Sequence, residues 1–242
     1  MPKKTDAKAL THLVDELRAA HGKNLASIVL YGSAAAGDHI ELRSDHNLVI
    51  VLNRITTEDL RLSQAPMREW QGLGQPLPVY FSVEELNDAA DVFPIEFLQM
   101  EKARKVLYGR DPFEFVQISR ANLRHQTEYE LRTKLIQLRR LYIPASTSIE
   151  KLSSLMSDSL ASFAALFRAV LILHGQEPPT TKAEIVRASA RLLELDVAPF
   201  EQIFELRANR LSLTEAEANK VFAAYMAQIE HVIEVVDRLD SK

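Results

Sequence analysis

Glycines and strand-like runs are distributed unevenly along this chain, and that unevenness restricts the folds it can adopt. Five of the seven glycines lie before residue 75. The same part of the chain holds short apolar, β-branched runs bounded by polar residues, which are typical of strands. After about residue 117 the pattern is almost purely helical. We therefore predict an α+β fold with two domains, a small mixed sheet with helices over residues 1–116 and an all-α domain over residues 117–242.

The elements expected in the first domain follow from apolar periodicity and turn residues. Strands are expected at residues 27–31, 48–52, 77–81 and, as an edge strand, 106–108. Helices are expected at residues 6–20, at 56–70 with an interruption at Pro66, from Ser82 onward, and at 94–102. A capping box made by Ser82 and Glu85 predicts the start of the short third helix.

The second domain is expected to be an up-and-down bundle of four or five helices. Their predicted spans are residues 119–143, 149–174, 182–195, 199–209 and 215–239. Capping boxes at Thr181–Glu184 and Thr214–Glu217 support two of the starts. Pro144 is expected to mark a loop.

Composition excludes several kinds of chemistry. The chain has 242 residues, a net charge of −4 and no cysteine, so disulfides, thiolate zinc sites and a cysteine nucleophile are ruled out. Nothing in the charge balance indicates binding to nucleic acid or to a membrane surface. No signal peptide or membrane-spanning run is predicted, and a cytoplasmic location is expected.

One constellation points to phosphate chemistry. Gly32 and Ser33 follow an apolar strand, and free backbone amides at such a turn attract phosphate. Asp45 and Asn47 are two residues apart in the next strand-like run, so their side chains are expected to project to the same side. Two acids at that spacing hold two Mg²⁺ ions beside a triphosphate. Asn47 stands where the second acid is needed.

This run resembles the defining motif of the polymerase-beta-like nucleotidyltransferase superfamily, in which Gly-Ser is followed by Asp-x-Asp/Glu in a later strand. The order of a small mixed sheet followed by a helical bundle is similar to that of the aminoglycoside nucleotidyltransferases. The resemblance implies that an NTP and Mg²⁺ bind and that a nucleotidyl group is transferred to an acceptor hydroxyl. In that scheme Gly32 and Ser33 bind the triphosphate, Asp45 binds metal, and Asn47 is a weakened second ligand.

The chain departs from the family pattern at three points. Asn47 replaces the second carboxylate, Ala36 stands where many relatives have arginine, and residues 78–81 offer no third carboxylate. Turnover is therefore expected to be poor or absent, leaving a nucleotide-binding or regulatory protein as the alternative. Asp38, Glu41 or a partner could replace the missing acids. The acceptor, the base of the NTP, and the choice between a monomer, a homodimer and a complex with a partner protein stay open.

A third hypothesis rests on the helical domain. Arg120 precedes His125, and Arg168 precedes His174, at spacings similar to the Arg-x(4–6)-His pattern of HEPN ribonucleases. That resemblance implies a helical RNase-type protein, in which the histidine and arginine act on an RNA phosphate, or a component of a toxin–antitoxin pair. The alternative is that these residues are surface or interface groups near helix ends, where a histidine suits the helix dipole.

Overall fold

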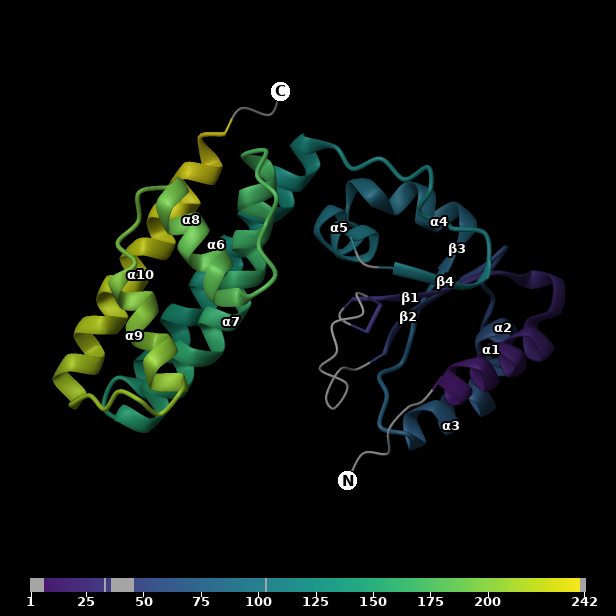
Figure 1. The fold of residues 1–242 in the computed structure, drawn as a ribbon, viewed down its shortest axis with the longest axis horizontal. Helices are drawn as coiled ribbons and strands as arrows, with labels where there is room; N and C mark the ends of the chain where they lie inside the picture. The colour runs from purple at the N-terminus through teal and green to yellow at the C-terminus, as the bar shows by residue number, and fades with distance from the viewer. Residues whose placement is uncertain (1–6, 33, 36–45, 103, 240–242) are drawn as a thin grey trace. The chain divides into compact units, whose positions relative to one another are not determined.

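The computed structural model describes residues 7–32, 34–35, 46–102 and 104–239 (Figure 1). The chain divides into two compact units, Met1–Ile118 (unit 1) and Ser119–Lys242 (unit 2). Whether each folds independently, as the predicted division after residue 116 implies, stays a prediction.

Unit 1 is built on a mixed sheet of four strands. The strands are β1 (Leu25–Tyr31), β2 (Asn47–Leu52), β3 (Val79–Ser82) and β4 (Arg104–Gly109). Their order is β3-β2-β1-β4. β1 is antiparallel to both β2 and β4, whereas β2 and β3 run parallel. The predicted mixed sheet is thus confirmed, including the place of residues 106–108 in an edge strand.

Helices cover both faces of this sheet. Alternate residues of β2 point to opposite faces, so Leu48 and Ile50 belong to one apolar core while Val49 and Val51 belong to the other. The first core is closed by α1 (Ala7–His21) and α3 (Gln64–Gly72), and the second by α4 (Val83–Asp88) and α5 (Pro94–Lys102) (Figure 1). The short helix α2 (Thr57–Leu62) has no buried residue. Burial on both faces explains why β2 is apolar throughout.

The helix predicted over residues 56–70 is broken at Ser63, not at Pro66. In a continuous helix Pro66 would lack the N–H that bonds to the carbonyl of Leu62, and its ring would collide with that carbonyl. The chain therefore ends α2 at Leu62 and places Pro66 in the first turn of α3. Ser63, at the break, shares a 2.8 Å hydrogen bond with the Nε2 atom of His21.

Unit 2 consists of five helices in its described part. They are α6 (Arg120–Ala145), α7 (Ile149–Leu173), α8 (Lys182–Leu192), α9 (Ala198–Arg207) and α10 (Glu215–Asp237). α7 packs against all four others. Contrary to expectation, α7 is long and apolar enough to span a membrane by length and composition. Half of that apolar window is buried inside the protein, and Phe163 and Phe167 belong to its buried face.

Three capping boxes formed as predicted, and one proline did not mark a loop. The boxes at Ser82, Thr181 and Thr214 each have both reciprocal hydrogen bonds. Pro144 lies within the last turn of α6, which ends one residue later. The N–H that proline lacks would have bonded to the carbonyl of Arg140. Because α6 ends one residue later, no further turn of helix has to continue past the proline.

The end of β4 approaches β1 so closely that only glycine fits. Gly109 has φ +78°, and a Cβ there would overlap the carbonyl oxygen of Ala26. Gly22 also has a positive φ, of +53°, but has open space around it. We expect Gly22→Ala to cost about 1–2 kcal/mol from backbone strain alone, and Gly109→Ala to cost several times more. Urea unfolding followed by circular dichroism measures both, and equal losses would contradict the close approach.

His21 is expected to make stability depend on pH. Burial lowers the pKa of His21, and the carboxylate of Asp59 opposes the shift only in part. The unfolded chain therefore binds the proton more readily, so the stabilisation is complete above the unfolded pKa of about 6.5 and is lost as the pH falls through the folded pKa.

The test compares the wild type with His21→Gln, which does not titrate. Between about pH 7.5 and about pH 5.5 the free energy of unfolding should fall less for the variant than for the wild type. His231→Gln, at an exposed position of α10, serves as the control. An unchanged pH dependence in His21→Gln would refute the assignment.

Candidate functional site

β1 ends in the glycine of the predicted motif. Gly32 has φ +80°, in the left-handed region that favours glycine. Its carbonyl accepts a 3.0 Å hydrogen bond from the amide of Ala35, so the chain turns sharply after the strand. Ser33, the second predicted phosphate ligand, lies outside the described residues.

The structure places Asn47 beside this turn. Asn47 is the first residue of β2 and lies opposite Tyr31 in the antiparallel register. A Cβ built on Gly32 would be 3.5 Å from the Nδ2 atom of Asn47. The two predicted site residues that can be located are therefore neighbours. Asp45 lies outside the described residues, as do the two candidate replacement acids, Asp38 and Glu41.

A group of side chains missed by the sequence reasoning anchors the start of β2. The amide of His46 donates a 2.8 Å hydrogen bond to the Oε1 atom of Gln75. The His46 ring lies edge-on to the buried ring of Trp70, with centroids 6.2 Å apart. Trp70 in turn donates from Nε1 to the carbonyl of Pro76 at 3.0 Å. His46, the residue before Asn47, is thus attached to the core under α3.

The strand register also aligns three side chains on one face of the sheet. Tyr31 pairs with Asn47 on one side and with Arg104 on the other, and directly opposed residues project to the same face. The Nε atom of Arg104 donates to the Oδ2 atom of Asp111 at 2.8 Å, which neutralises the guanidinium. Burial raises the pKa of Tyr31, so its phenol stays protonated at neutral pH.

The two acids that follow the third predicted strand, Glu84 and Glu85, lie too far along the sheet to be metal ligands at the motif. β2 and β3 run parallel with Leu52 opposite Ser82. Glu84 and Glu85 follow Ser82, so they lie beyond the end of β3 that is remote from Asn47. Glu85 serves instead as the capping partner of Ser82, as predicted.

The donor set suits one Mg²⁺ ion rather than two. Within the described ranges, no group of three histidine, aspartate or glutamate side chains could hold a metal. Asn47 contributes a neutral amide, and the only carboxylate of the Asp-x-Asn motif is that of Asp45. Mg²⁺ is commonly held by one or two carboxylates together with phosphate oxygens and water. One carboxylate, one amide and a triphosphate fit that pattern for a single ion.

The arginines of the helical hypothesis are held by backbone carbonyls. Arg120 donates from Nη2 to the carbonyl of Leu173 at 3.0 Å, and Arg168 donates to that of Pro179 at the same distance. Burial, together with the charge of Arg120, lowers the pKa of His174. His125 is exposed. Arg120 is thus associated with His174 at the end of α7, and both arginines have a structural role there.

A solved structure shares this fold. It is the spectinomycin adenyltransferase AAD(9) from Enterococcus faecialis, solved with ATP and spectinomycin. The TM-score is 0.58 and the sequence identity 13%, and the alignment covers 96% of this chain and 99% of that one. No protein-family model matches the sequence, and no curated protein does. The likeness confirms the predicted α+β fold, a small mixed sheet with helices followed by a helical region, over nearly the whole chain.

Gly32→Ala tests the turn. The substitution should cost about 1–2 kcal/mol because alanine resists a positive φ, while the new methyl group would be only at ordinary contact distance from Asn47. Gly72→Ala, in α3 with open space around it, is the control and should stabilise or leave stability unchanged. Thermal unfolding of both variants measures the difference. A Gly32→Ala protein as stable as the wild type would show that the turn does not require glycine.

Proposed function

We propose that this protein binds a nucleoside triphosphate with Mg²⁺ where β1 ends and β2 begins, and that this site serves nucleotidyl transfer to a hydroxyl acceptor. The proposal is carried by the left-handed Gly32 lying against Asn47. That pair occurs within a fold similar to an adenyltransferase solved with ATP. Neither observation would suffice alone, because tight turns after strands are common.

The chemistry of the turn suits a phosphate. Glycine without a Cβ lets an anion approach the backbone closely, and amide groups at such a turn donate to it. In the proposal the hydroxyl of Ser33 adds a further donor, and Asp45 with Asn47 holds the ion. Bound Mg²⁺ would neutralise the charge that develops on the transferred phosphorus.

We further propose that turnover is weak. An amide at position 47 removes one negative charge from the metal site, which lowers ion affinity by an amount on the order of several kcal/mol at intermediate dielectric. β3 (Val79–Ser82) contains no carboxylate that could accept the proton of the attacking hydroxyl. Both features favour a protein that binds nucleotide but transfers the nucleotidyl group slowly or not at all.

A nucleotide-binding regulator is the second candidate, and Asn47 is the observation that favours it. The strand pairing of Asn47 with Tyr31 depends on backbone hydrogen bonds, so the amide does not disturb the sheet. A site can thus keep its shape and its affinity for phosphate after losing a carboxylate needed for catalysis. The acceptor would then be unnecessary, and bound NTP would act by stabilising the folded state.

Nucleotide binding is the first measurement. ATP with Mg²⁺ should raise the melting temperature of the wild type, and Asp45→Ala should abolish the rise. Asn47→Asp should strengthen the Mg²⁺ dependence by restoring the charge. Glu101→Ala, at an exposed site on α5, is the control. No stabilisation by any of the four common NTPs would refute the proposed site.

Pyrophosphate release separates the two candidates. An enzyme should release pyrophosphate from NTP when a hydroxyl-bearing acceptor such as an aminocyclitol is present, and Asn47→Asp should increase the rate. A regulator should bind NTP and release none, whatever acceptor is supplied. Release that persists in Asp45→Ala would place the chemistry elsewhere in the molecule.

A further inference from the structure

We propose that the open edge of β3 is a docking site for an extended, basic peptide segment, which would add to the sheet as a further strand. The inference concerns unit 1 alone and does not depend on nucleotide binding. It rests on the unpaired edge, on a groove beside it, and on the charge of the groove.

β3 is an edge strand. In the described sheet it is hydrogen-bonded to β2 only. The amide of Ser82 donates to the Oε2 atom of Glu85 rather than to β2. Because successive residues of a strand alternate in direction, the amide and carbonyl of Tyr80 are the pair that faces away from β2. An unpaired edge of this kind is a template for an incoming strand.

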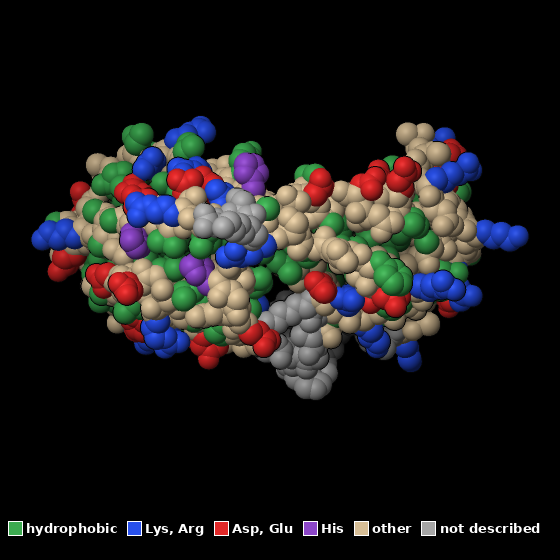
Figure 2. All heavy atoms as spheres, turned by 90° about the horizontal axis from the view of Figure 1, so that it is seen from above, with side chains coloured by type: hydrophobic (Ala, Val, Ile, Leu, Met, Phe, Trp, Pro, Cys, Tyr) green, Lys and Arg blue, Asp and Glu red, His purple; other side chains and the backbone are tan. Residues whose placement is uncertain are grey.

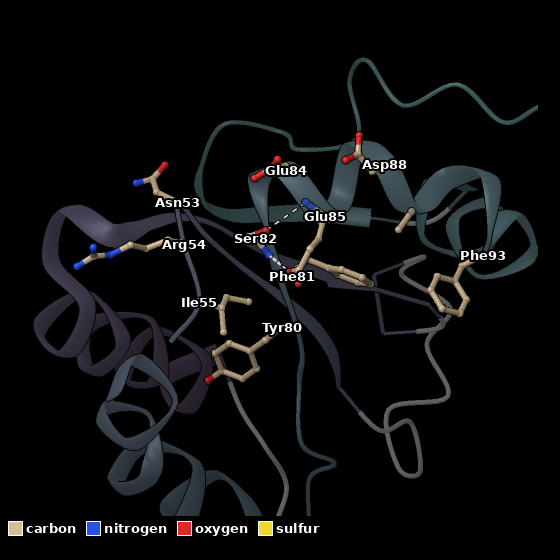
Figure 3. Close-up of a pocket in the computed structure, with 11 residues that line it drawn as sticks. Asn53, Arg54, Ile55, Tyr80, Phe81, Ser82, Glu84, Glu85, Asp88 and Phe93 are labelled. Carbon is tan, nitrogen blue, oxygen red and sulfur yellow. Dashed lines mark hydrogen bonds between the residues drawn. The ribbon is translucent and has the colours of Figure 1, made fainter. Parts of the chain in front are cut away.

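A groove of about 690 Å³ follows this edge. Ile55 and Tyr80 line it on one side of β3, and Phe81 and Phe93 on the other (Figure 3). The two walls therefore come from opposite faces of the sheet. Side chains of an added strand also alternate between faces, so they would fall on both walls. Val79 is 40% exposed and Phe93 44% exposed, which leaves apolar surface for such side chains to cover.

The negative charge of the groove favours a basic peptide. Glu84 and Asp88 are one turn apart on α4, and neither makes an ion pair with any other described residue. Glu85 adds a third carboxylate, while Arg54 is the single cationic side chain among those lining the groove. Figure 2 looks onto the α4 side of unit 1, where acidic and hydrophobic side chains lie next to one another on that half of the molecule. Lysine or arginine side chains on the incoming strand would neutralise the carboxylates.

A second copy of this chain fits less well. The groove beside its own β3 edge is lined by the same three carboxylates and one arginine, so a second copy offers no excess of cationic side chains to neutralise them. The groove also continues to Asn53 and Arg54, beyond the end of β2 that is remote from Asn47. It is therefore distinct from the proposed nucleotide site.

The test uses a fluorescein-labelled peptide of about six residues in which lysine and valine alternate, a length that matches a typical strand. Fluorescence anisotropy should show saturable binding with a dissociation constant on the order of 10–100 μM. The same peptide with alternate backbone nitrogens methylated cannot pair with a strand edge and should bind at least about tenfold more weakly. A glutamate–valine peptide should not bind.

Variants locate the site. Glu84→Gln combined with Asp88→Asn should weaken binding of the lysine peptide about tenfold, as expected for losing two charge-assisted contacts. Glu16→Gln, at an exposed position of α1, should leave binding unchanged. Circular dichroism confirms that each variant is folded. The proposal is overturned if the lysine peptide fails to bind below about 1 mM, if methylation has no effect, or if the α4 variant binds like the wild type.

Discussion

The antiparallel pairing of β1 with β2 is the constraint on which unit 1 depends. It sets Tyr31 opposite Asn47 and so brings the turn at Gly32 against the start of β2. A slip of one residue would move each core side chain of β2 to the other face of the sheet. Because both faces are buried under helices, such a slip would disrupt two apolar cores at once. The register, and with it the geometry of the site, is thus held by the hydrophobic effect.

The contacts that hold the start of β2 do not involve a carboxylate at position 47. Asn47 contributes its backbone to the sheet, while the neighbouring His46 is held by its amide bonded to Gln75 and by contact of its ring with the buried ring of Trp70. Neither interaction requires a carboxylate at position 47. The shape of this part of the sheet is therefore maintained by strand pairing and by the packing of His46, and it does not depend on the charge of residue 47.

Local signals in the sequence predicted much of the fold. The capping boxes at Ser82, Thr181 and Thr214 formed as expected because their hydrogen bonds span only three residues. The strands ending at Tyr31 and Leu52 followed from continuous apolar runs. The predictions were wrong where the effect of a proline depended on its position within the helix. Pro66 displaced a helix break to Ser63, and Pro144 was accommodated inside a final helical turn.

The sequence alone determines the order of the helices and strands, the apolar runs of the buried strands, and the presence of Gly32 and Asn47. Each of these depends only on residue type and on short spacing along the chain. Which residues became neighbours is a property of the folded molecule. Strand order and register place Arg104 opposite Tyr31 and place Glu84 beyond the end of β3 that is remote from Asn47. They also leave the groove beside β3 open. Contacts between residues dozens of positions apart are determined by the joint burial of several elements, and no short segment of sequence contains that information.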